Sequence, residues 1–117
     1  MATILIVDDE PMQIRLLRAI MEETDHRVLE ATGGQQALDV MAQQSCDLII
    51  TDCDMPGMNG LELAQRVLAY QPDFPILFLT GAMSDDRQLA IEAMGCQGIT
   101  KPYSPLRLLA LVNQLLS

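Results

Sequence analysis

Four short pieces of this chain carry side chains that could act together on one chemical group. Each follows a short, largely apolar run; the pieces are Asp8 with Asp9, Asp52, Thr80 and Lys101. In an open parallel α/β sheet, ligand sites lie at the carboxyl ends of the strands. If the four runs are neighbouring strands, three carboxylates, a hydroxyl and an ammonium group meet at one edge of a sheet. We therefore predict one site for a divalent metal ion and a phosphoryl group.

This set of groups suits phosphoryl transfer to a carboxylate. A carboxylate is a competent but weak nucleophile, and clustered acids repel an incoming anionic phosphoryl group. Mg²⁺ prefers oxygen ligands and usually keeps several waters, so it could bridge an aspartate and a phosphoryl oxygen. Lys101 could neutralise a second oxygen, and the Thr80 hydroxyl could donate to a third.

Apolar periodicity, glycines and prolines predict five strands that alternate with five helices. The predicted strands are 3–7, 27–31, 47–51, 75–80 and 98–100, and the predicted helices run from 11 to about 23, 34 to about 44, 61 to 70, 85 to 94 and 105 to about 116. Such an alternation implies a doubly wound parallel sheet with right-handed crossovers. The strands barely alternate in polarity, which fits burial on both faces. At 117 residues the chain is expected to form one domain.

Two of these helices carry clear boundary signals. Asn59, with Glu62 three residues later, resembles a capping pair for the helix at 61–70. Ser84 is placed to cap the next helix, and Gly95 to stop it.

The composition narrows the classes of function. The net charge is −9, from 16 acidic and 7 basic residues. Setting aside five acids near the predicted site (Asp8, Asp9, Glu10, Asp52 and Asp54) still leaves 11 acidic residues against 7 basic ones. An acidic surface argues against direct nucleic-acid binding, which needs clustered cations, and against binding to an anionic membrane.

Other whole-chain signals point to a reduced environment. No apolar stretch approaches the roughly 20 residues of a membrane span, and no basic stretch precedes the first strand, so we expect no signal peptide. The three cysteines, Cys46, Cys53 and Cys96, form no CxxC pair, which argues against structural zinc and a disulfide framework. We therefore expect a cytoplasmic protein.

Four motifs at these positions resemble the receiver domain of bacterial two-component response regulators, such as the chemotaxis regulators. They are IVDDE at 6–10, ITDCDMPGMNG at 50–60, FLTGA at 78–82 and ITKPY at 99–103. The resemblance extends over essentially the whole of 1–117 as one receiver domain. It implies a flavodoxin-like (βα)5 fold with strand order 2-1-3-4-5. It also implies that the protein is not an enzyme acting on separate substrates, but catalyses its own phosphorylation and dephosphorylation.

Carried over residue by residue, the resemblance implies that Asp52 is the phosphoacceptor. The phosphoryl group would come from a phosphohistidine on a sensor histidine kinase or a histidine phosphotransfer protein. Asp9, Asp52 and the backbone carbonyl of Asp54 would bind Mg²⁺ directly. Asp8 would act mainly through a bound water.

The resemblance also assigns roles on the other strand ends. Thr80 would donate its hydroxyl to the phosphoryl group, Lys101 would pair with it, and the peptide bond before Pro102 is expected to be cis. In the family, the side chains two past the acceptor and two past the threonine modulate hydrolysis. Here these are Asp54 and Ala82. Ala82 cannot orient a water, whereas the Asp54 carboxylate could orient one or repel an incoming nucleophile.

The chain departs from the family three residues before the lysine, where receivers usually carry Tyr, Phe or His. Here the residue is Gly98, so no aromatic ring can swing inward at that position. We expect phosphorylation to move mainly the loop at 81–84 and the start of the following helix, because Gly81 leaves that backbone free to shift. Tyr103 does not obviously replace the missing ring.

The last predicted helix is unusually apolar. Its apolar side chains span about 160° of the helix circumference, wider than the ~100° that one packed face needs; they are Leu108, Leu109, Leu111, Val112, Leu115 and Leu116. Two interpretations stay open: the helix packs deeply against its neighbours, or part of it forms a surface for a homodimer or an output partner.

Two other classes of function stay open at this point. Asp52-Cys53-Asp54 is similar to the DxD nucleophile of haloacid-dehalogenase-type phosphatases, which also use a later Thr or Ser and a Lys. Those enzymes carry their second acidic pair after the lysine, whereas Asp8 and Asp9 come first here, and they usually need cap elements that 117 residues cannot hold. The other class is a receiver-like scaffold with a dead site, which the intact acids, threonine and lysine argue against.

Each motif taken alone has a simpler interpretation. An Asp-Asp pair after a strand is usually a turn or a helix cap, and a Thr at a strand end reflects β-propensity. It is the joint spacing that favours a site. His26 falls in a predicted turn and is assigned no chemistry. Cys53, next to the acceptor, is either redox-sensitive or an inert small residue.

Overall fold

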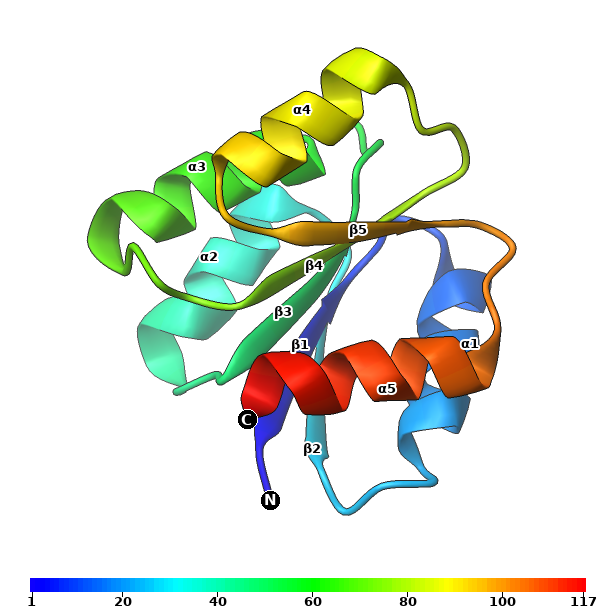
Figure 1. The fold of residues 1–117 in the computed structure, drawn as a ribbon. Helices are drawn as coiled ribbons and strands as arrows, with labels where there is room; N and C mark the ends of the chain where they lie inside the picture. The colour runs from blue at the N-terminus through cyan, green and yellow to red at the C-terminus, as the bar shows by residue number, and fades with distance from the viewer.

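Five parallel strands form one sheet in the computed structural model, which describes residues 1–117 (Figure 1). The strands are β1 (Thr3–Val7), β2 (Arg27–Ala31), β3 (Leu48–Asp52), β4 (Ile76–Thr80) and β5 (Gln97–Thr100). The helices are α1 (Pro11–Met21), α2 (Gly34–Gln43), α3 (Gly60–Tyr70), α4 (Asp85–Ala93) and α5 (Pro105–Leu116). The sheet order is β2-β1-β3-β4-β5, which confirms the predicted topology.

All ten predicted elements are present, and their ends differ from the prediction by no more than two residues. The first helix is two residues shorter than expected, because the Thr24 hydroxyl donates to the Met21 carbonyl (2.6 Å) and supports a turn there. β3 starts one residue late, at Leu48, and extends one residue further to include Asp52. The candidate acceptor therefore lies within the strand and is held by its ladder.

The boundary signals of α3 and α4 act as predicted. The Asn59 side chain accepts from the Glu62 amide (2.9 Å), while the Glu62 carboxylate accepts from the Asn59 amide (3.1 Å). Ser84 Oγ accepts from the Arg87 amide at the start of α4 (3.1 Å). Gly95 follows α4 with a φ of +72°, a left-handed conformation that glycine adopts without strain.

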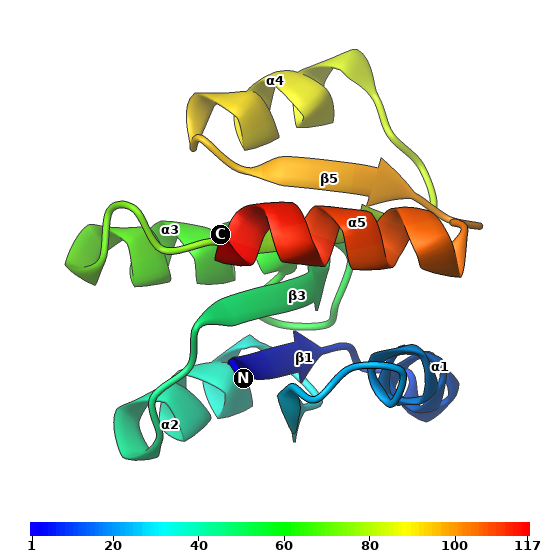
Figure 2. The same ribbon diagram turned by 60° about the horizontal axis from the view of Figure 1, so that its bottom comes forward.

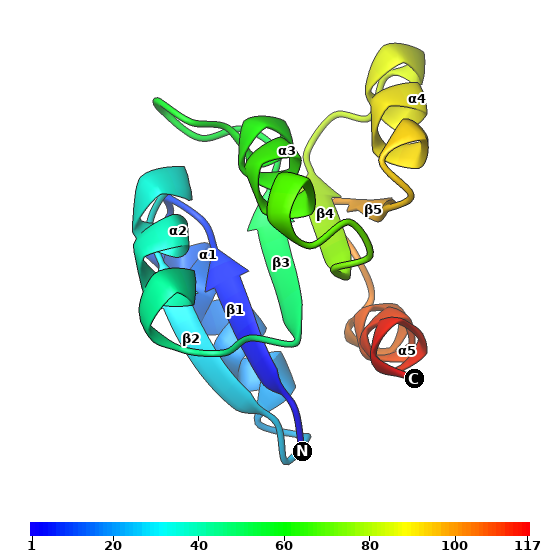
Figure 3. The same ribbon diagram turned by 90° about the vertical axis from the view of Figure 1, so that its left-hand side faces the viewer.

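Helices cover both faces of the sheet, with α2, α3 and α4 on one side and α1 and α5 on the other (Figures 2 and 3). Successive strand residues point to opposite faces. Thus Leu5 and Phe78 pack beneath α2, α3 and α4, whereas Ile4 and Leu77 pack beneath α1 and α5. All four side chains are fully buried, which explains why the strands are apolar without alternation.

The wide apolar stripe of α5 is mostly used in packing. Leu108 and Val112 are fully buried in the core beneath α1 and α5. Four further side chains pack against the same core while partly buried; they are Leu109, Leu111, Leu115 and Leu116. Leu106, in the first turn, is 78% exposed. None of the helices has the length and apolar character needed to cross a membrane.

The close approach of Gly60 to the end of β3 predicts the effect of adding a side chain there. A Cβ at this first residue of α3 would lie 2.2 Å from the Asp52 carbonyl oxygen and 3.1 Å from the Cys53 Cα. Gly60→Ala should lower the free energy of unfolding by about 1–3 kcal/mol, because backbone atoms cannot move aside as a side chain can. The measurement is urea unfolding followed by circular dichroism.

Gly81→Ala is the matched control for this substitution. A Cβ at Gly81 meets nothing within 4 Å, so this variant should change the free energy of unfolding by less than about 0.5 kcal/mol. Equal losses in the two variants would show that the close approach at Gly60 does not stabilise the fold.

Candidate functional site

The strand register brings the four chemical pieces to one edge of the sheet. Thr80, the last residue of β4, pairs with Thr100, the last residue of β5, so Lys101 begins where β4 ends. The last residue of β1 pairs with the residue before Asp52, so Asp8 and Asp52 emerge side by side. The structure therefore brings together the side chains that the sequence placed after separate apolar runs.

Three carboxylates form the centre of this edge. One oxygen from each of Asp8, Asp9 and Asp52 lies within 4.8 Å of the others. Asp8 is completely buried and Asp52 is 6% exposed, whereas Asp9 is open to solvent. Burial raises the pKa of the Asp8 carboxyl, and the neighbouring Asp52 and Asp9 charges add to the effect.

One oxygen atom of Asp8 gives the clearest indication that this cluster suits a cation. Asp8 Oδ1 accepts from the Glu10 amide (2.9 Å), but Asp8 Oδ2 is buried without a hydrogen-bond partner. A buried acceptor without a donor is costly. An oxygen-only set of ligands is what Mg²⁺ prefers, so these residues fit that ion.

One ammonium group faces these acids. Lys101 Nζ lies 3.4 Å from Asp52 Oδ1 and 3.8 Å from Asp8 Oδ2. The Lys101 amide also donates to the Thr80 carbonyl (2.7 Å), and the Lys101–Pro102 peptide bond is cis. A single positive charge leaves the three-carboxylate cluster negative, which favours binding of a divalent cation.

The Thr80 hydroxyl is buried and fully engaged. It donates to the Ala82 carbonyl (2.9 Å) and accepts from the Ala82 amide (3.2 Å). It also accepts from Arg87 Nη1 at 2.9 Å. A hydroxyl has one proton to donate, so in this arrangement it is not free to donate to another group.

Arg87 is a site residue that the sequence prediction missed. Its guanidinium contacts Thr80, Ala82 and the Asp54 carboxylate from the first turn of α4. The available signal was electrostatic: a cation in the first turn of a helix is disfavoured by the helix dipole, so an arginine there indicates an anionic partner nearby.

Cys53 and Tyr103, both near the acids, are neutral groups. Burial raises the pKa of the Cys53 thiol to about 11, which favours the inert interpretation over the redox-sensitive one. Burial also raises the pKa of the Tyr103 phenol to about 12. Tyr103 packs on the α1 and α5 side of the sheet, whereas Gly98 faces Ile91 on the other side. Tyr103 therefore does not replace the missing ring.

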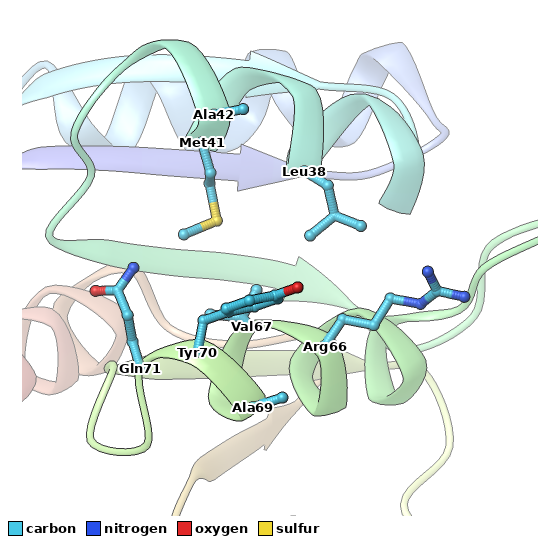
Figure 4. A pocket seen from close by; sticks show the side chains of 8 residues that line it. All are labelled: Leu38, Met41, Ala42, Arg66, Val67, Ala69, Tyr70 and Gln71. Carbon is cyan, nitrogen blue, oxygen red and sulfur yellow. The ribbon is translucent and has the colours of Figure 1, made fainter.

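A cavity of about 630 Å³ lies elsewhere, between α2 and α3 (Figure 4). Leu38 and Met41 of α2 face Tyr70 of α3 across it. Its lining is mostly apolar and includes none of the acids, the threonine or the lysine described above. Cavity size therefore does not locate the chemistry in this protein.

Comparisons with known proteins give one consistent result. The response regulator receiver domain family matches residues 4–113. The chain is 38% identical over 114 residues to the transcriptional regulatory protein YvrH of Bacillus subtilis, and 37% identical over 115 residues to the aerobic respiration control protein ArcA of Escherichia coli. These matches cover 96% and 97% of the chain but 48% of each relative, so the chain spans about half the length of these curated relatives.

A solved structure supports the same relationship. The chemotaxis protein CheY4 of Vibrio cholerae superposes with a TM-score of 0.91 at 29% sequence identity. The superposition covers 98% of both chains. The likeness therefore includes the whole sheet and the edge that carries the acids.

The acidic cluster predicts stabilisation by metal. Mg²⁺ should raise the melting temperature, because it relieves repulsion among the three carboxylates and binds only where the fold assembles them. At ten times its Kd the ion would add about 1.4 kcal/mol, or roughly 3–6 °C. Asp8→Asn should raise the melting temperature of the metal-free protein and shrink this increment. Scanning fluorimetry at constant ionic strength measures both, and an increment unchanged by Asp8→Asn would contradict a role for Asp8.

The buried thiol predicts selective alkylation. At pH 8 the native protein should react with iodoacetamide at the half-buried Cys46 well before Cys53. Burial raises the pKa of both thiols, but Cys53 is only 1% exposed, and with a pKa of about 11 it forms little thiolate at pH 8. The Cys53 rate should rise as the pH approaches 11, or on unfolding in urea. Peptide mass spectrometry measures the two rates, and rapid labelling of native Cys53 at pH 7 would indicate an activated thiol instead.

Proposed function

Because this chain belongs to the response regulator receiver domain family, we propose that it accepts a phosphoryl group on Asp52 from a phosphohistidine. The observation that carries the proposal is the meeting of Asp8, Asp52 and Lys101 at one edge of the sheet. The donor would be a sensor histidine kinase or a histidine phosphotransfer protein. A cytoplasmic location and a single receiver domain over residues 1–117 are parts of the same proposal.

The transfer step forms one bond and breaks another. A carboxylate oxygen of Asp52 attacks the phosphorus, and the P–N bond to the donor imidazole breaks with its electron pair on nitrogen, which takes up a proton from solvent. The strand ladder fixes the backbone of Asp52, and its 6% exposure leaves the carboxylate within reach of a donor. Lys101 Nζ, 3.4 Å from Asp52 Oδ1, is placed to offset charge on the transferred oxygens.

The acids around Asp52 would hold Mg²⁺. Asp9, Asp52 and the backbone carbonyl of Asp54 would bind it directly, and Asp8 through a water. When bound, the ion would supply positive charge that offsets the negative charge of the Asp52 carboxylate and of the phosphoryl group. The Glu10 amide fixes one oxygen of Asp8, which leaves the unpartnered oxygen for the ion or its water.

After transfer, Thr80 would bind the phosphoryl group on Asp52, and Asp54 would affect the rate at which that group is hydrolysed. To donate to the phosphoryl group, the Thr80 hydroxyl must give up its bond to the Ala82 carbonyl. Asp54 and Ala82 would modulate hydrolysis. Because Arg87 holds the Asp54 carboxylate, we expect that carboxylate to orient water poorly while the contact lasts.

The partner that receives the output is a further part of this proposal. The chain spans about half the length of the relatives that are named transcriptional regulatory proteins, and a net charge of −9 does not favour DNA as a direct partner. A second copy of the chain or an output partner could use the first turn of α5, where Leu106 is exposed. The family match favours a receiver over a haloacid-dehalogenase-type phosphatase.

Phosphoryl uptake tests the function. Incubation with acetyl phosphate and Mg²⁺ should add one phosphoryl group, seen by intact mass and lost at alkaline pH. Asp52→Asn should abolish uptake while the fold persists, because the amide is not a nucleophile. Asp9→Asn should slow uptake by about 10-fold or more through weaker metal binding.

Asp39→Asn, the same change on the solvent side of α2, is the control and should label like the unmodified protein. Stoichiometric labelling of Asp52→Asn at a single site would move the acceptor elsewhere. No uptake by the unmodified protein would favour a scaffold with a dead site, and turnover of added phosphoesters would favour a phosphatase.

A further inference from the structure

The side chain of Arg87 joins three segments around the site. Nη1 lies 2.9 Å from Thr80 Oγ1, 3.1 Å from Asp54 Oδ2 and 3.1 Å from the Ala82 carbonyl oxygen. Nη2 lies 2.8 Å from Asp54 Oδ1. The two bonds to Asp54 make a bidentate pair, which is geometrically specific as well as stronger than a single bond. One guanidinium therefore links the loop after β3, the end of β4 and the first turn of α4.

This contact bears directly on the threonine. The Thr80 hydroxyl has its one proton on the Ala82 carbonyl and receives bonds from the Ala82 amide and from Arg87. Thr80 is completely buried, so its hydroxyl cannot exchange these partners for water without a cost. If it turns to a phosphoryl group on Asp52, the arrangement around Arg87 must change at the same time.

The packing beside Gly98 shows which segments a rearrangement around Arg87 would move. A Cβ on Gly98 would lie 3.1 Å from Ile91 Cδ1 and 3.2 Å from Met83 Cε. Met83 lies in the loop that follows Thr80, and Ile91 is a buried residue of α4. The space beside this residue of β5 is therefore already taken by side chains from the loop and from α4.

We propose that Arg87 is a positioning residue for the phosphoryl switch: it holds the Thr80 hydroxyl toward Ala82 in the resting protein, and phosphorylation of Asp52 releases it, which passes the signal into α4. This role rests on the proposed function, since the phosphoryl group is what draws the hydroxyl away. Arg87 acts through Thr80 and Asp54 rather than on the reacting atoms. The route needs no aromatic ring at position 98.

Amide hydrogen exchange tests the proposal, with beryllofluoride and Mg²⁺ as the phosphoryl mimic. In the unmodified protein, exchange at residues 81–88 should accelerate by about threefold or more when the mimic binds. In Arg87→Ala the same amides should exchange fast without the mimic, so the difference between the two states should fall to less than half. Arg87→Lys keeps the charge but loses the bidentate geometry, so it should lie between the two.

Two further variants distinguish loss of the Arg87–Asp54 contact from a general destabilisation of α4. Gln88→Ala changes the next residue of the helix, whose side chain bonds to Glu92, and should leave the response as in the unmodified protein. Asp54→Ala leaves α4 intact and removes the partner of Arg87 in the loop after β3, and should also accelerate resting exchange at 81–88. Loosening in Arg87→Ala without loosening in Asp54→Ala would overturn the proposed link.

Phosphoryl uptake by intact mass is measured first on every variant, so that two failures can be told apart. Lack of uptake by the unmodified protein would count against the proposed function itself. Normal uptake, together with an exchange response in Arg87→Ala equal to that of the unmodified protein, would overturn the role of Arg87 alone.

Discussion

The unbalanced charge at the carboxyl edge of the sheet is the constraint on which the rest of this structure depends. Three carboxylates lie within 4.8 Å of one another, and Lys101 is the one ammonium group in ion-pair contact with them. Burial strengthens the repulsion, because charges interact more strongly where water is excluded. The free energy that holds the acids together must come from the core below them, where the strands are packed on both faces. The same repulsion makes a divalent cation and a cationic neighbour favourable at this edge.

The backbone around Asp52, the proposed acceptor, is well anchored. Asp52 lies inside β3 and pairs with Leu79 of β4. Gly60, the first residue of α3, lets the helix begin directly against the Asp52 carbonyl. The preceding residue, Asn59, caps the helix through reciprocal bonds with Glu62. If Asp52 is the nucleophile, as we propose, a backbone held in this way loses little freedom on reaction, which is the benefit of positioning in phosphoryl transfer. The packing that supports Asp52 would therefore contribute to the proposed transfer.

The two cations of the edge differ in what they contact. Lys101 reaches the buried acids directly, whereas Arg87 reaches the exposed Asp54 and the buried Thr80. Lys101 compensates negative charge within the acidic cluster, whereas Arg87 links the loop after β3 to the end of β4. With glycine at position 98, the side chains of Met83 and Ile91 close against β5. A displacement that starts at Thr80 would therefore shift the loop after β4 and α4 before it altered the surface of β5.

The sequence alone determined the ten elements, their order and the positions of the acids, threonine and lysine at strand ends. These features follow from local apolar periodicity and from the rule that parallel strands gather their carboxyl ends at one edge. Only the tertiary structure decided which partners the side chains take. Arg87 and Asp54 are 33 residues apart in sequence, and no local pattern encodes the distance between their loops. Likewise, α5 is apolar over a wide arc, but how much of that arc is buried depends on how closely the helix approaches the sheet. Periodicity is a property of one segment, whereas a contact depends on the geometry of two.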